Sequence, residues 1–65
     1  MKPIMATLAH ARALGYCARG MRRWFTDHHY SWPVFVQHGV STEWLRATED
    51  AMAIRLAEEA ERETL

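Results

Sequence analysis

The sequence lacks the features that define several large classes of protein. No run of apolar residues approaches the roughly 20 needed to span a bilayer. The chain has 65 residues, too few for a multidomain enzyme. Its single cysteine, Cys17, cannot form an internal disulfide, and the first residues show no signal-peptide pattern, so we expect a protein of the reducing cytoplasm.

What is present suits one small folded domain. The apolar fraction is 49%, and three Trp, two Phe, two Tyr and four Met supply the bulk for a compact core. A domain of this size buries only about 60% of its unfolded surface, which leaves little room for an enclosed substrate cavity. We therefore expect a non-enzymatic protein that acts through its surface, with no cofactor, no small-molecule substrate and no membrane contact.

Charge is balanced in total but divided between the two halves of the chain. Residues 1–30 hold five Lys or Arg and one Asp, a net charge of +4. Residues 31–65 hold three Arg and seven Asp or Glu, a net charge of −4. This division favours either a basic face for an acidic partner or head-to-tail self-association, unless both sets are simply solvated helix faces.

Cap and turn signals predict an all-α domain of about four to five short helices. Thr7 is a plausible N-cap for a helix over 8–14, which Gly15 can end. A second helix is expected over 16–28. We expect a single domain over 1–65, with an N-terminal arm (1–6), a helical core (7–47) and an acidic C-terminal helix (48–65).

The helix expected over 16–28 has the clearest periodicity. At about 100° per residue, one arc is mainly apolar and the opposite arc is basic. The first arc contains Leu14, Cys17, Ala18, Met21, Trp24, Phe25 and His28. The second contains Arg19, Arg22, Arg23 and Thr26, which together with Arg12 we predict to bind a partner. Gly20 inside the pattern indicates a close backbone neighbour or a helix that begins later.

Three further helices follow from similar signals. Ser31 before Trp32-Pro33 predicts a helix that Gly39 terminates, and Ser41 predicts a short one after it. Thr48 is the predicted N-cap of the last helix, in which Ile54 lies outside the apolar stripe, either as an ordinary exposed residue or as a second partner contact. The predicted core anchors are Leu14, Cys17, Met21, Trp24, Phe25, Trp32, Phe35, Trp44, Leu45, Met52 and Leu56.

Residues capable of metal or nucleophilic chemistry are present, but their spacing argues against it. Cys17 and the four histidines (His10, His28, His29, His38) lack the paired ligands of a structural zinc site. Cys17 and His28 lie about 16 Å apart along one helix, too far for a thiolate and its base. His28-His29 is either a helix end favoured by the dipole or a pH-responsive contact beside Tyr30 and Trp32.

The stretch 11–25, Ala-Arg-Ala-Leu-Gly-Tyr-Cys-Ala-Arg-Gly-Met-Arg-Arg-Trp-Phe, resembles a helix-turn-helix of the excisionase and MerR type. The resemblance implies a turn at Leu14-Gly15, a recognition helix anchored by Met21 and Trp24, and arginines that face DNA. Cys17 stands where the family has a Ser or Thr cap, and no wing or minor-groove arm is identifiable.

The whole chain also resembles a family of very small helical proteins encoded by tailed bacteriophages and prophages. The resemblance lies in residues 15–25 (Gly-Tyr-Cys-Ala-Arg-Gly-Met-Arg-Arg-Trp-Phe), 31–35 (Ser-Trp-Pro-Val-Phe) leading to Gly39-Val40, and 47–53 (Ala-Thr-Glu-Asp-Ala-Met-Ala). Many members have Gly where Tyr30 or Glu49 stands here. The resemblance implies a virion or assembly protein, in the host cytoplasm or in the virion.

Taken together, these features predict a virion or assembly component that docks the basic arc of the helix over 16–28 on an acidic protein, or on another copy of itself. A small helix-turn-helix DNA-binding regulator is the main alternative, because arginines also bind phosphates. A metal-binding protein is the third.

Overall fold

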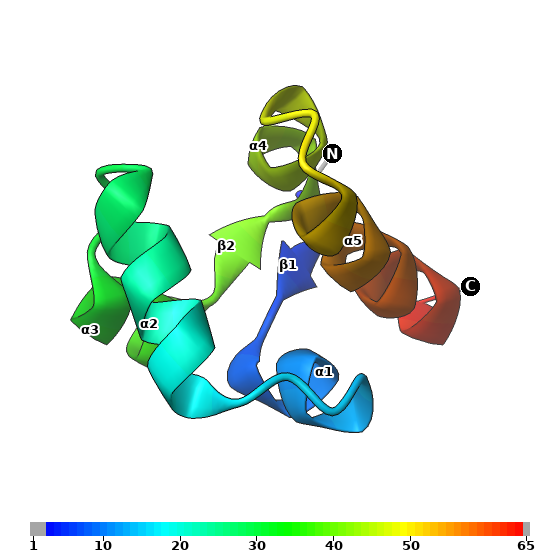
Figure 1. The fold of residues 1–65 in the computed structure, drawn as a ribbon. Helices are drawn as coiled ribbons and strands as arrows, with labels where there is room; N and C mark the ends of the chain where they lie inside the picture. The colour runs from blue at the N-terminus through cyan, green and yellow to red at the C-terminus, as the bar shows by residue number, and fades with distance from the viewer. Residues whose placement is uncertain (1–2, 65) are drawn as a thin grey trace.

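A computed structural model describes residues 3–64 of the chain, excluding the side chain of residue 64. Over these residues five helices surround one short antiparallel strand pair (Figure 1). The elements in chain order are β1 (Met5–Ala6), α1 (Leu8–Ala13), α2 (Ala18–Asp27), α3 (Trp32–His38), β2 (Val40–Ser41), α4 (Thr42–Ala47) and α5 (Ala51–Thr64). The expectation of a mostly helical single domain is confirmed, and the strand pair is an addition to it.

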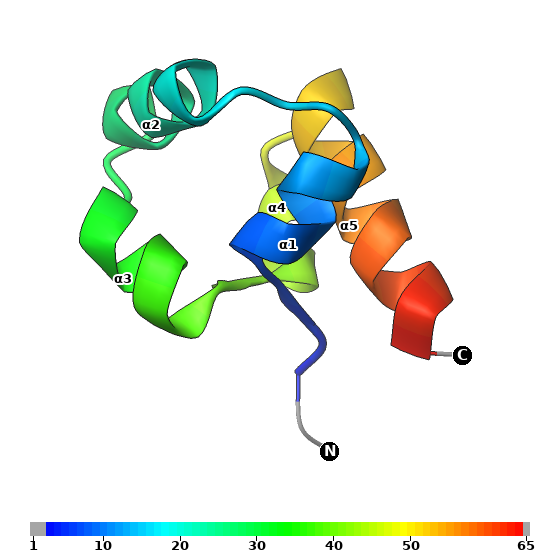
Figure 2. The same cartoon turned by 90° about the horizontal axis from the view of Figure 1, so that it is seen from below.

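The helices form two groups on either side of the strands. α2 packs against α3, while α5 packs against α4, α1 and β1. Figure 2 shows the α2–α3 pair on one side of the molecule and α1, α4 and α5 on the other. The basic helix therefore stands apart from the acidic one.

The two strands join the N-terminal arm to the middle of the chain. Met5 pairs with Ser41 and Ala6 with Val40, and the Thr42 N–H donates to the Ile4 carbonyl at 3.0 Å. Two-residue strands are too short to produce an alternating pattern, which is why they could not be predicted from the sequence.

α1 begins and ends at the residues that the sequence indicated. The Thr7 N–H donates to His10 Nδ1 at 2.9 Å at the start of the helix. After the helix, Gly15 has φ +78°, the Gly15 N–H donates to the Arg12 carbonyl and the Tyr16 N–H to the Ala11 carbonyl. This is a Schellman motif, in which glycine adopts the left-handed conformation without steric strain.

α2 begins later than predicted, and this changes the role of Cys17. Cys17 is the N-cap residue, with extended backbone angles, and its Sγ accepts the Gly20 N–H at 3.3 Å. The prediction that Cys17 is a core anchor is wrong, because the residue is exposed. Gly20 lies in the first turn, where a Cβ would stand 3.3 Å from that sulfur.

The later helices start at caps of the expected type, with one correction. Ser31 accepts the Val34 N–H, and Ser41 accepts the N–H groups of Glu43 and Trp44. The cap of α5 is Asp50, whose Oδ1 accepts the Met52 N–H at 2.9 Å. The predicted cap Thr48 instead ends α4, where its hydroxyl donates to the Leu45 carbonyl at 2.7 Å.

The core lies between the two helix groups. Its fully buried larger side chains are Phe25, Phe35, Met21, Leu45, Leu56 and Val40. The other predicted anchors, apart from Cys17, are half-buried and pack against this cluster: Leu14, Trp24, Trp32, Trp44 and Met52. Phe25 stacks on Phe35 with ring centroids 4.4 Å apart, so the aromatic centre of the core joins α2 to α3.

Candidate interaction surface

α2 has one face in the core and one in solvent, as its periodicity predicts. Met21 is 1% exposed and Phe25 is fully buried, whereas Arg19, Arg22, Arg23 and Thr26 are all exposed. We call the three exposed arginines of α2 the arginine face. Because the buried face fixes the helix on the core, these guanidinium groups extend from a backbone held in place by packing.

The arginine face has no acidic partner among the described residues. In this part of the chain Arg46 pairs with Glu61 (2.5 Å), Arg62 pairs with Glu59, and His10 Nε2 lies 3.1 Å from a Glu63 oxygen. These contacts all involve acidic residues of α5. These acidic side chains of α5 therefore have partners outside α2.

The contact between Arg46 and Glu61 shifts the pKa of both side chains. Arg46 donates from Nε to one oxygen of Glu61 at 3.1 Å and from a terminal nitrogen to the other at 2.5 Å. These hydrogen bonds lower the pKa of Glu61 and raise the pKa of Arg46. The bidentate contact links α4 to α5 and is unrelated to the basic face.

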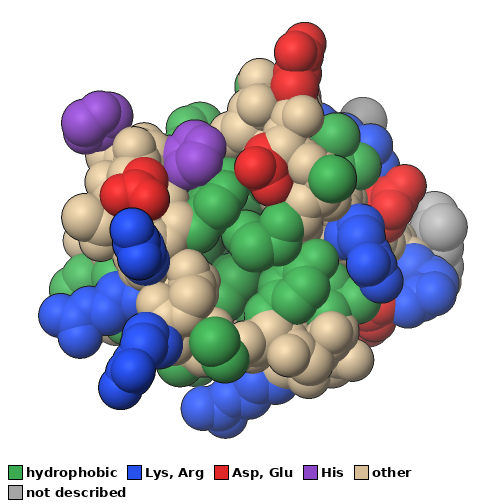
Figure 3. Space-filling view, viewed as in Figure 1, with side chains coloured by type: hydrophobic (Ala, Val, Ile, Leu, Met, Phe, Trp, Pro, Cys, Tyr) green, Lys and Arg blue, Asp and Glu red, His purple; other side chains and the backbone are tan. Residues whose placement is uncertain are grey.

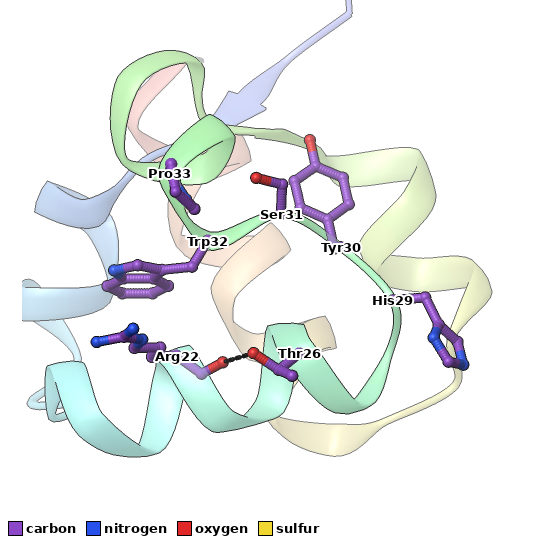
Figure 4. Close-up of a pocket in the computed structure, with 7 residues that line it drawn as sticks. All are labelled: Arg22, Thr26, His29, Tyr30, Ser31, Trp32 and Pro33. Atoms are coloured by element: carbon purple, nitrogen blue, oxygen red, sulfur yellow. Dashed lines mark hydrogen bonds between the residues drawn. The ribbon is translucent and has the colours of Figure 1, made fainter.

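A groove of about 510 Å³ runs beside the arginine face, between α2 and the start of α3. Arg22 and Thr26 line its α2 side, and residues 29–33 line the remainder. Figure 4 shows the Arg22 and Trp32 side chains pointing toward one another at one end, whereas His29 points away from the others. The Thr26 hydroxyl donates to the Arg22 carbonyl at 2.9 Å.

The turn between α2 and α3 sets the shape of this groove. His29 has φ +60°, its N–H donates to the Thr26 carbonyl, and the Tyr30 N–H donates to the Phe25 carbonyl. The Tyr30 hydroxyl then donates to the Gly39 carbonyl at 3.2 Å, beyond the far end of α3. The left-handed residue of this turn is therefore His29; Glu49, between α4 and α5, also has a positive φ, +58°.

His28 and His29 occupy different surroundings. His28 is the C-cap of α2, its ring stacks on Trp24 with centroids 4.0 Å apart, and its Nδ1 lies 2.9 Å from the Trp24 carbonyl. His29 is exposed in the turn. The two histidines therefore lie at the end of α2, which is one of the two interpretations of this pair, and His28 packs on the Trp24 ring.

The other predicted contact residues lie away from the groove. Arg12 is exposed on α1, a helix that packs against α5, and Ile54 is half-buried on α5. Cys17 borders a second hollow of about 330 Å³, together with Tyr16, Met21 and Met52. The predicted apolar arc is buried at Met21 and Phe25 and half-buried at Trp24, whereas Cys17 and Ala18 at the start of α2 are exposed.

The charge distribution is visible in the space-filling view. Basic side chains lie along the left and lower edges of Figure 3, at the side where Figure 1 places α2, and others lie beside acidic side chains on the right, where Figure 1 places α5. Apolar side chains fill the centre of this face. Among the described residues, no group of three or more His, Cys, Asp or Glu side chains is placed to hold a metal ion. No helix within 3–64 has the length and apolar character needed to cross a membrane.

Trp32, predicted as a core anchor and as a neighbour of the alternative His28-His29 contact, also lines the groove beside Arg22, which was not predicted from the sequence. Its ring packs on Phe25 and Phe35. The available signal was Pro33, which starts a new helix close after α2 and so creates a corner between them.

Comparisons with known proteins add no relationship: no family model, curated protein or solved structure matches the chain.

Proposed function

We propose that this chain is a non-enzymatic interaction protein that docks its arginine face on an acidic protein surface. The observation that carries the proposal is that three exposed guanidinium groups lie on one packed helix without an acidic partner among residues 3–64. Arginine forms bidentate hydrogen bonds with carboxylates, and arginine and tryptophan are enriched at interface hot spots.

We further propose that the partner belongs to a bacteriophage virion or to its assembly machinery. The support is the resemblance of residues 15–25, 31–35 and 47–53 to small phage-encoded proteins. The domain then acts as an adaptor whose basic face binds a larger, acidic structural protein.

DNA binding is the second candidate, and one observation favours it. Gly15 adopts the left-handed turn that the helix-turn-helix resemblance implies, and Cys17 caps the following helix. However, α1 packs on α5 while α2 packs on α3. The exposed α2 side chains are mainly arginines, which suit phosphates or carboxylates better than the reading of base edges.

Co-purification tests the proposal directly. The tagged chain is expressed with bacteriophage capsid and tail proteins, and their recovery is compared between wild type, Arg22→Glu and Arg55→Glu. Arg55 is exposed on α5, so its substitution makes the same charge change away from the arginine face. We expect Arg22→Glu alone to abolish recovery; equal recovery with all three chains contradicts the proposal.

Fluorescence anisotropy with a labelled random 20-base-pair duplex separates the two candidates. For a protein-docking surface we expect no binding at low salt. Tight binding that weakens steeply as salt rises, and that Arg22→Glu removes, assigns the surface to DNA instead.

A further inference from the structure

The groove beside the arginine face presents charge and an aromatic ring to the same position. Its α2 wall carries the Arg22 guanidinium, and its α3 wall carries the Trp32 indole and the Pro33 ring. The side chains of Arg22 and Trp32 point toward one another (Figure 4). A ligand seated there contacts a cation and apolar surface together.

Trp32 is held in place before any partner binds. Its ring lies 6.1 Å from that of Phe25 and 5.5 Å from that of Phe35, both centroid to centroid, and both phenyl rings are fully buried. The residue nevertheless remains half-exposed. An aromatic side chain fixed in this way loses little rotamer freedom on binding, which is one reason that such residues act as anchors.

Apolar surface continues from the groove along α3. Pro33 is exposed, and Val36, three residues later on the same side of the helix, is 46% exposed. Val34 on this helix is 43% exposed. Exposed apolar side chains beside a cationic groove favour a protein partner with apolar groups of its own over a phosphate backbone.

We propose that this groove receives one large apolar side chain of the acidic partner, while Arg22 binds a carboxylate next to that side chain. The inference rests on the proposed function and adds the chemistry of the recognised motif: an Asp or Glu beside a Phe or Leu. Charge complementarity favours a separate protein over a second copy, because acidic residues of α5 already pair with cations of their own chain.

Two synthetic peptides test this inference. Each has four alternating Asp and Glu residues on both sides of a central residue, which is Phe in one peptide and Ser in the other. Binding to the full chain is measured by NMR titration, with the indole N–H signal of Trp32 as the local probe. We expect the Phe peptide to bind at least about tenfold more tightly, the low end of what burial of one large apolar side chain contributes, and to shift the Trp32 signal.

A variant that fills the groove locates the effect. Thr26→Gln lengthens a lining side chain at an exposed helix position, where Gln has the higher helix propensity, so the variant retains its fold. We expect it to abolish the preference, so that this variant binds the Phe and Ser peptides with similar affinity. Ala18→Gln, exposed on the same helix outside the groove, retains the preference.

The possible outcomes distinguish this inference from the proposed function. Equal affinities of the two peptides for wild type overturn the groove inference and leave the arginine face as a docking surface. Failure of both peptides to bind overturns both. If Thr26→Gln still prefers the Phe peptide, the apolar side chain binds elsewhere and the inference is overturned. The inference is also overturned if wild type self-associates in sedimentation velocity and Thr26→Gln removes that self-association, because the groove then binds a second copy of the chain.

Discussion

At the scale of single residues, Cys17 shows how a cap determines where a helix begins. The thiol satisfies the Gly20 N–H, one of the donors that the first turn of α2 leaves unpaired, at 3.3 Å. Sulfur is a weak acceptor, so a hydroxyl at this position makes the stronger cap.

Substitutions of Cys17 distinguish a capping role from a packing role. We expect Cys17→Ser to raise the free energy of unfolding by up to about 1 kcal/mol and Cys17→Ala to lower it by about 0.5 kcal/mol. Urea denaturation followed by circular dichroism gives both values. The opposite order, with Ser less stable than Ala, indicates a buried apolar position and contradicts the cap.

At the scale of elements, two side-chain contacts hold the C-terminal end of α5. Arg46 of α4 binds Glu61, and His10 of α1 approaches Glu63 at 3.1 Å. The helix also packs through small and apolar residues along most of its length, with Ala53, Leu56, Ala57 and Ala60 buried. The side-chain contacts at its end therefore add to the packing of a helix that the core already holds.

The Arg46–Glu61 contact predicts a pH dependence of stability. Because hydrogen bonds from Arg46 lower the pKa of Glu61, the folded state binds fewer protons at this site than the unfolded chain. Its contribution is fully present above the ordinary glutamate pKa of about 4.3 and is lost as the pH falls through the lowered pKa.

Thermal melts of wild type and Glu61→Gln check this dependence. We expect the variant to melt at a lower temperature than wild type near neutral pH, with the difference closing as the solution is acidified to about pH 2. Glu49→Gln, an exposed residue between α4 and α5, serves as the control. A difference that stays constant down to that pH contradicts a role for the ionised carboxylate.

At the scale of the whole molecule, the joint between β1 and β2 connects distant parts of the chain. Gly39 precedes β2 with φ 79° and ψ −169°, a conformation open essentially to glycine alone. A Cβ there would lie 2.6 Å from the Ala6 carbonyl oxygen. This closeness lets the N-terminal strand lie between the helix groups.

Two glycine substitutions with similar φ test this joint. Gly15→Ala meets no atom within 4 Å, so we expect only the left-handed penalty, about 1 kcal/mol of unfolding free energy. Gly39→Ala adds a collision with the Ala6 carbonyl, so we expect its free energy of unfolding to fall by at least about 2 kcal/mol more than that of Gly15→Ala. Urea denaturation compares the two; equal losses contradict the close approach of β1.

Local signals account for most of what could be predicted of the fold. Gly15, Ser31 and Ser41 act within a few residues of themselves, so their turns and caps follow from sequence. Thr48 and Asp50 both fit the rule for an N-cap residue. Asp50 caps α5 because α4 continues up to Thr48, which the local sequence does not specify. Cap rules therefore locate a boundary more reliably than they choose between adjacent candidates.

The candidate surface was predictable only in part. The arginine face follows from a 3.6-residue period within one helix, which needs no knowledge of the neighbours. The groove needs the angle between α2 and α3, which depends on the Tyr30 bond to Gly39 and on the contact of Phe25 with Phe35. These contacts join separate elements, and no local pattern specifies them.

By itself, the sequence determined the helical character of the protein and the separation of a basic from an apolar face on α2, because both depend on periodicity and caps along a continuous segment. The tertiary structure decided that Cys17 is exposed, that β1 pairs with β2 and that Trp32 faces Arg22 across a groove. Each of these depends on which surfaces meet in space, since burial and proximity are properties of the packed chain.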